Sequence, residues 1–150
     1  MQVLIVDDEQ LARDRLARMV SDLEGHTVIG EAGNGVQAVE LAGRDRPDLV
    51  LLDIRMPGMD GLEAARHLLQ LEEPPAVVFC TAYEEHAIEA FDVQAVGYLL
   101  KPVRKDDLSR VLASAHRLNK VQLGALDEDG ERRSHISCLL YTSPSPRDRG

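Results

Sequence analysis

Cysteine is scarce in this 150-residue sequence, and its placement argues against the common zinc sites. The two cysteines, Cys80 and Cys138, are far apart, and neither belongs to a CxxC motif or a Cys/His cluster. Cys80 stands in the apolar run VVFC, which favours a buried thiol that behaves as a small hydrophobic side chain. We therefore expect no zinc centre.

Long apolar runs are also absent. No stretch approaches the roughly eighteen apolar residues that a membrane span needs. The N-terminal residues MQVLIVDDE lack the basic and then apolar pattern of a secretory signal. We therefore expect a cytoplasmic protein that does not contact a membrane.

Basic residues are outnumbered by acidic ones. The 17 Lys and Arg residues against 26 Asp and Glu give a net charge of −9. Residues 1–119 carry the whole excess, with 12 basic and 21 acidic residues, because residues 120–150 hold five of each. Such an acidic domain repels the phosphate backbone of nucleic acids. We expect this fragment to bind no nucleic acid, and its partners to be proteins, cations or small phosphoryl donors.

Strand-like and helix-like segments alternate along a chain whose length and 44% hydrophobic content suit one globular core. Short apolar runs predict five strands, at 3–6, 27–30, 48–53, 76–80 and 95–100. Helical periodicity predicts helices that begin near Gln10 and at 35–45, 60–72, 84–91 and 104–118. At 35–45 the expected apolar stripe holds Val36, Val39 and Leu41. Continuous apolar strands covered by helices on both faces indicate a doubly wound α/β fold with a parallel sheet.

The unusual residues of this sequence follow the carboxyl ends of the predicted strands. Asp7 and Asp8 follow the first strand, Asp53 ends the third, Thr81 follows the fourth and Lys101 follows the fifth. In doubly wound sheets, ligands bind outside the carboxyl ends of the strands. We therefore expect three carboxylates, a hydroxyl and an ammonium group to meet at one edge of the sheet.

These groups suit magnesium-assisted phosphoryl transfer. Three carboxylates brought together need a counter-charge or raised pKa values, and Mg²⁺ prefers such hard oxygen ligands. Asp53 precedes the loop IRMPGMDG, which leaves it open to solvent, and a carboxylate there can act as a nucleophile toward phosphorus. Lys101 and Thr81 would then bind the phosphoryl oxygens.

Each of these residues also has a simpler interpretation. Asp7 or Asp8 could cap the helix that begins near Gln10. Asp53 could be a turn residue, Thr81 a helix cap and Lys101 a solvated charge. Only their placement at successive strand ends favours a common site.

The motifs VDDE, LLDIRMPGMDG, TA after an apolar strand, and YLLKP together resemble the receiver domain of two-component response regulators. The resemblance spans residues 1 to about 118 and implies a CheY-like, five-stranded sheet of order 2-1-3-4-5. It implies that Asp53 is the phosphoacceptor. It assigns the Mg²⁺ ligands to Asp7, Asp8, Asp53 and the backbone carbonyl of Arg55.

The same resemblance assigns a switch. Thr81 matches the switch hydroxyl, Lys101 the phosphate-pairing lysine, and Tyr98 the aromatic residue that moves inward on activation. It also favours a cis Lys101–Pro102 peptide bond, although Pro102 could instead be a trans proline at a helix start. Tyr98 could likewise be a simple packing residue. A sensor histidine kinase would be the donor, and the surface of the fourth helix, fifth strand and fifth helix would mediate homodimerisation or output contacts. Such a domain is not an enzyme, although slow loss of its own phosphoryl group is expected.

Two further alternatives compete with this interpretation. A metal-dependent phosphohydrolase would also use clustered acids and a lysine, but it usually needs an acid two residues after its nucleophile, where this chain has Arg55. A pseudo-receiver that only binds proteins would not require the whole set of acids, threonine and lysine.

Within the receivers, LLDIRMPGMDGLEAA and FCTAYEEHAIEAFDVQAVGYLLKPV look most like regulators with a LytTR DNA-binding output domain, of the kind that controls alginate synthesis in pseudomonads. We expect 1–119 to be the receiver domain and the polar 120–137 to be a linker toward an output domain that is missing here. The end, 138–150, resembles translated sequencing-adapter read-through. It is expected to be non-native or a disordered tail.

Overall fold

The computed structural model describes residues 1–83, 87–124 and 139–141. Strands and helices alternate along the chain, as the apolar runs predicted. In chain order the elements are β1 (Gln2–Val6), α1 (Gln10–Ser21), β2 (Thr27–Ala32), α2 (Gly35–Asp45), β3 (Leu49–Leu52), α3 (Gly61–Leu69), β4 (Ala76–Thr81), α4 (Ala87–Asp92), β5 (Gly97–Leu100), α5 (Lys105–Gly124) and β6 (Leu139–Tyr141).

All strand pairs of the sheet are parallel, and the strand order is β2-β1-β3-β4-β5-β6. The predicted order 2-1-3-4-5 is confirmed for the five predicted strands. A short sixth strand, β6, pairs with β5 and lies in the segment that the sequence assigned to a non-native or disordered tail. The order reverses at β1, which lies between β2 and β3 and so places the end of β1 beside the end of β3.

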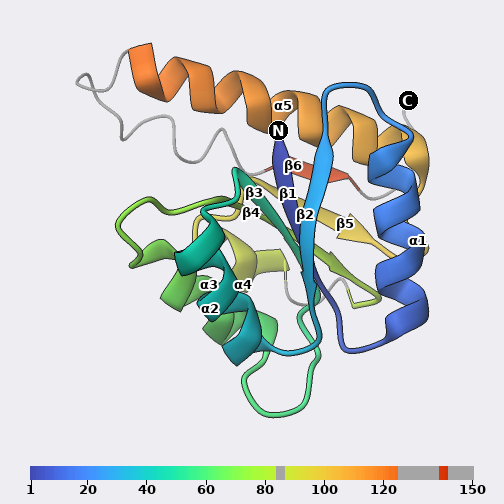
Figure 1. Cartoon of the computed structure of the whole chain (residues 1–150), viewed down its shortest axis with the longest axis vertical. Coiled ribbons are helices and arrows are strands. Elements are labelled where there is room, and N and C mark those ends of the chain that lie inside the picture. The colour runs from blue at the N-terminus through green and yellow to red at the C-terminus, as the bar shows by residue number, and fades with distance from the viewer. Residues whose placement is uncertain (84–86, 125–138, 142–150) are drawn as a thin grey trace.

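Successive residues of each central strand enter opposite layers of the core. In β1, Val3 and Ile5 pack with α1 and α5, whereas Leu4 and Val6 pack with α2, α3 and α4. β3 and β4 alternate in the same way. Figure 1 shows the two layers, with α1 and α5 on one face of the sheet and α2, α3 and α4 on the other. Helices cover both faces of the sheet, which explains why the central strands consist of consecutive apolar residues.

The helices differ from their predicted forms at a few points. Within α2 the buried residues are Gly35, Ala38 and Ala42, whereas Val36 is 53% exposed. α5 extends to Gly124, beyond the expected domain boundary at 119. The first three residues of the predicted helix 84–91 lie outside the described residues. No helix in the described part of the chain is long and apolar enough to cross a membrane.

The loop after β3 returns to the sheet through a very close backbone contact. The Gly61 N–H donates a hydrogen bond to the Ile54 carbonyl oxygen at 2.7 Å, and the Asp60 carboxylate caps α3 by accepting from the Glu63 N–H at 2.9 Å. A Cβ atom on Gly61 would lie 2.1 Å from the carbonyl oxygen of Asp53. The start of α3 therefore holds the backbone of Asp53, and only glycine fits there.

Substitution of Gly61 by alanine tests this contact. We expect Gly61→Ala to lower the free energy of unfolding by about 2–3 kcal/mol, because the added methyl group forces the backbone apart. Gly43→Ala is the control, since its Cβ would meet only Leu71 at 3.8 Å, and a helical alanine should be neutral or stabilising by up to about 1 kcal/mol. Urea denaturation of both variants measures the difference, and equal stabilities would contradict the account.

Candidate functional site

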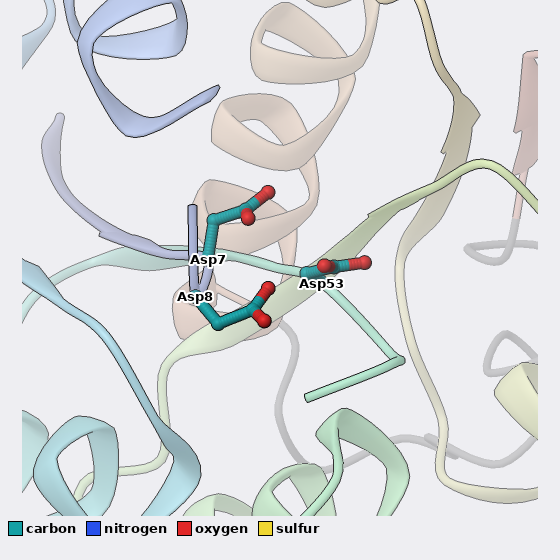
Figure 2. A group of neighbouring side chains, drawn as sticks. All are labelled: Asp7, Asp8 and Asp53. Atoms are coloured by element: carbon teal, nitrogen blue, oxygen red, sulfur yellow. The ribbon is translucent and has the colours of Figure 1, made fainter. Parts of the chain in front are cut away.

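Three carboxylates meet where the carboxyl ends of β1 and β3 lie side by side. Asp7 and Asp8 follow β1, and Asp53 follows β3. One ligand oxygen of each lies within 4.8 Å of the others, and Figure 2 shows the three carboxylates pointing to the same side. Asp8 is exposed, whereas Asp7 and Asp53 are buried, so the expectation that the loop leaves Asp53 open to solvent was wrong. The predicted cluster of acids is therefore present, with one member facing solvent.

Backbone hydrogen bonds fix the two buried acids. The Asp53 N–H donates to the Val6 carbonyl at 3.0 Å, and the Asp7 N–H donates to the Ala32 carbonyl at 3.1 Å, so both residues extend the ladder of the sheet. Asp7 Oδ1 accepts from the Glu9 N–H at 2.9 Å. The N-cap of α1 is Glu9, whose side chain makes no capping bond. Helix capping therefore does not account for the acidic pair, although one Asp7 oxygen supports the turn into α1.

Lys101 brings a positive charge from the end of β5 to the buried acids. Its Nζ lies 2.7 Å from Asp7 Oδ2 and 3.6 Å from Asp53 Oδ2. Burial alone would lower the pKa of the ammonium group, but the hydrogen bond that Lys101 donates to Asp7 and the negative charge of Asp53 outweigh it, so the pKa is raised. Lys101 therefore stays charged and joins β5 to β1 and β3. The Lys101–Pro102 peptide bond is cis, as predicted.

Asp53 has an unusual affinity for protons. Burial raises its pKa to about 6; the charge of Lys101 and a hydrogen bond with the Ile54 backbone oppose the rise, and the charges of Asp7 and Asp8 add to it. Near neutral pH the Asp53 carboxyl group is ionised, although its burial makes the charged form unfavourable. A carboxylate held this way gains from any cation that approaches it.

The donor set fits a hard divalent cation. Three carboxylates face one ammonium group, which leaves net negative charge at the site. Among the described residues, they are the only group of three or more acids, histidines or cysteines close enough to share an ion. The carbonyl oxygen of Arg55, on the loop after Asp53, stays a predicted fourth ligand.

Thr81 and Tyr98 are both buried beside this edge. Thr81 is the last residue of β4, and its Oγ1 accepts from the Tyr83 N–H at 3.3 Å. Tyr98 has no exposed surface, packs against Phe79 with ring centroids 6.2 Å apart, and donates its hydroxyl hydrogen bond to the Tyr83 carbonyl. The resemblance predicted that activation carries Tyr98 inward. In this structure the ring of Tyr98 is buried.

Several contacts at the site were not predicted from the sequence. Arg13 of α1 donates to the Asp7 carbonyl at 2.6 Å and pairs with Glu31 at 3.3 Å, which ties α1 and β2 to the acidic edge. The Arg55 guanidinium lies over the Tyr83 ring, 4.1 Å from its centroid. No spacing in the sequence indicates the second contact, because it joins side chains of two separate loops.

Comparisons with known proteins agree with the motifs. The sequence matches the response regulator receiver domain over residues 3–113. It is 56% identical over 143 residues to the positive alginate biosynthesis regulatory protein of Pseudomonas aeruginosa, covering 91% of this chain and 58% of that protein. It is 38% identical over 120 residues to the sensory transduction protein LytT of Bacillus subtilis, covering 80% and 50%. The chain thus spans about half the length of these curated relatives.

Solved structures share the fold. The response regulatory domain of protein mrkE from Klebsiella pneumoniae superposes with a TM-score of 0.69 at 32% identity, covering 81% of this chain and 97% of that one. The REC domain of AraT, a response regulator from Geobacillus stearothermophilus, gives a TM-score of 0.72 at 34% identity with the same coverage. The doubly wound architecture and the family motifs therefore occur together in this chain.

The raised pKa of Asp53 predicts that the charge of this residue destabilises the metal-free protein. The folded-state pKa of about 6 lies above the ordinary 3.8, so stability falls as the pH rises between these values. In EDTA at about pH 7.5, we expect Asp53→Asn to raise the free energy of unfolding by about 1–2 kcal/mol, after allowance for partial solvent screening. The gain should shrink toward about pH 4, where wild-type Asp53 becomes protonated.

Urea denaturation across that pH range measures the effect. Glu72→Gln, at an exposed acid of the α3–β4 connection, is the matched control and should change stability little at any pH. A variant Asp53→Asn that is no more stable than wild type at neutral pH, or whose gain grows as the pH falls, would contradict the assignment.

Proposed function

The chain belongs to the response regulator receiver domain family, and on that premise we propose that it accepts a phosphoryl group on Asp53. One observation carries the proposal: Asp53, after β3, shares a sheet edge with Asp7 and Asp8, which both follow β1, and with Lys101, which follows β5. An aspartate that only formed a turn would not require two further carboxylates and an ammonium group beside it.

The chemistry follows from the groups at hand. An Asp53 carboxylate oxygen attacks the phosphorus of the donor, the bond to the donor breaks, and an acyl phosphate forms on Asp53. The Lys101 ammonium, 3.6 Å from Asp53 Oδ2, is within reach to pair with the new phosphoryl oxygens. The Thr81 hydroxyl oxygen accepts the Tyr83 N–H and keeps its own proton for donation. The attacking group must be ionised, and the charge of Lys101 favours that form.

Asp7, Asp8 and Asp53, with the Arg55 carbonyl, would hold Mg²⁺. When bound, the ion offsets negative charge on the donor phosphoryl group and on the carboxylates. The residues of the chain fix the orientation of the acceptor: the Val6 carbonyl and the start of α3 hold the Asp53 backbone in place. Positioning and charge neutralisation are the main contributions that a protein makes to such a transfer.

We propose that the phosphoryl group acts by shifting a conformational equilibrium. Contacts from Thr81 and Lys101 to the new oxygens would favour the state in which Tyr98 is buried. That state alters the α4-β5-α5 surface, through which the domain would dimerise or contact its output partner.

The partners and the parent protein are inferred from the family and the relatives. A sensor histidine kinase supplies the phosphoryl group, and the molecule works in the cytoplasm. The parent is a LytTR-type transcriptional regulator, whose DNA-binding domain would lie outside this chain, since the chain covers 58% of the alginate regulator and 50% of LytT. The domain itself is a phosphoacceptor with slow self-dephosphorylation rather than a turnover enzyme, because Arg55 occupies the position at which a phosphohydrolase carries its general acid.

Phosphorylation by a small donor tests the proposal. Incubation with acetyl phosphate and Mg²⁺ should add one phosphoryl group to the intact mass of the chain. Asp53→Asn and EDTA should each abolish the gain, whereas Glu72→Gln should keep it. Uptake of phosphate by Asp53→Asn would show that another residue is the acceptor.

Binding of Mg²⁺ tests the acidic pair separately. Magnesium should raise the thermal midpoint of the wild-type chain through preferential binding to the folded state. Asp8→Asn, which removes the exposed ligand, should weaken the apparent affinity about tenfold or more, because roughly 1.4 kcal/mol of lost charge attraction has that effect. Equal magnesium responses of wild type and Asp8→Asn would remove Asp8 from the ligand set.

A further inference from the structure

Three contacts from three parts of the chain meet at Tyr83. The Arg55 guanidinium stacks on the Tyr83 ring at 4.1 Å. The Tyr83 N–H donates to Thr81 Oγ1 at 3.3 Å, and the Tyr83 carbonyl accepts from the Tyr98 hydroxyl. Tyr83 is therefore bonded at its ring, its nitrogen and its carbonyl oxygen at once.

These contacts join the loop that follows Asp53 to the interior of the sheet. Arg55 stands two residues after Asp53, Thr81 ends β4, and Tyr98 is the second residue of β5. Tyr83 lies just beyond β4 and is 38% exposed, whereas Tyr98 is fully buried. An exposed residue thus supplies the hydrogen-bond acceptor for a buried phenol. Loss of a hydrogen bond made by a buried hydroxyl is costly, so the position of the Tyr83 carbonyl affects how favourable the burial of Tyr98 is.

We propose that the Arg55–Tyr83 stack is a latch that keeps the Tyr83 carbonyl in place and thereby favours the buried position of Tyr98. Arg55 is then a positioning residue that acts through its side chain, apart from any role of its backbone carbonyl. The stack occurs together with the hydrogen bond from the Tyr98 hydroxyl to the Tyr83 carbonyl. Its meaning for signalling rests on the proposed function, because only phosphorylation of Asp53 would place a signal at the loop that carries Arg55.

The latch also implies a route from the acceptor to the switch. Any shift of the loop after Asp53 moves the guanidinium, and the guanidinium moves the ring and carbonyl of Tyr83. Coupling is reciprocal, so burial of Tyr98 equally favours the loop position that stacks Arg55 on Tyr83. The stack is partly solvent-exposed, and cation–π contacts of that kind shift an equilibrium by about two- to fivefold.

The test follows Tyr98 directly in the full chain, without donor and in EDTA. Tyrosine labelled with ¹³C in the ring gives few NMR signals, since the chain has three tyrosines, and Tyr98→Phe identifies the signal of interest. Arg55→Gln should raise the ratio of outward to buried Tyr98 about two- to fivefold. Tyr83→Leu should raise it at least as much, and adding Arg55→Gln to Tyr83→Leu should have no further effect. Arg55→Lys, which keeps the cation, should restore part of the wild-type ratio.

Two matched controls separate the latch from general effects of charge and ring. Arg66→Gln removes an exposed arginine on α3, and Tyr83→Phe keeps the ring and the backbone carbonyl. Both should give the wild-type ratio. An unchanged ratio in Arg55→Gln, or equal changes in Arg55→Gln and Arg66→Gln, overturns the proposal. Because no phosphoryl donor is present, a failure of Asp53 to accept phosphate would leave this measurement intact, and the two failures are distinguishable.

Discussion

The site depends on the burial of the Asp7 carboxylate against the Lys101 ammonium group. A carboxylate with no exposed surface requires a compensating charge, and Lys101 Nζ supplies it at 2.7 Å. The pair connects the ends of β1 and β5, which are separated by two strands of the sheet, and so sets the width of the space between them. Asp53 lies within that space, and one ammonium group must serve two buried acids. The resulting excess of negative charge at this edge of the sheet favours the binding of a cation.

The parallel sheet makes this arrangement possible. Parallel strands deliver their carboxyl ends to one edge, so residues that are far apart in sequence reach the same place without long loops. The layers of helices seen in Figure 1 cover both faces of the sheet, and Asp8 at that edge is exposed to solvent. Close backbone contacts, above all between Gly61 and Asp53, then fix the acceptor. Backbone packing therefore fixes the position of the Asp53 carboxylate, while the side chains supply the charge of the site.

Local patterns in the sequence predicted the parallel sheet and the convergence of the acids, whereas the strand order was predicted from the family resemblance. Unbroken apolar runs are characteristic of covered parallel strands, and an acid directly after such a run falls at the carboxyl edge. Predictions failed where tertiary contacts decide the outcome. Val36 belongs to an apolar pattern but is exposed, because the small residues Ala38 and Ala42 form the face of α2 that packs on the sheet. The strand β6 was missed because three residues between polar segments carry no periodicity that can be read.

Side-chain contacts across loops were the least predictable part of the site. The family resemblance predicted that Lys101 pairs with the phosphoryl group on Asp53. In the structure Lys101 lies closer to Asp7 than to Asp53, and only the folded geometry shows this difference. The contact of Arg55 with Tyr83 joins residues from two loops, so it depends on how both loops leave the sheet. Neither contact leaves a spacing in the sequence that would reveal it.

Chemical trapping of the phosphorylated residue tests the central claim most directly. After exposure to acetyl phosphate and Mg²⁺, borohydride reduces an aspartyl phosphate to homoserine, and peptide mass spectrometry locates the converted residue. The account predicts homoserine at position 53 alone. Conversion at Asp7 or Asp8, or no conversion in a sample whose intact mass has gained a phosphoryl group, would contradict it.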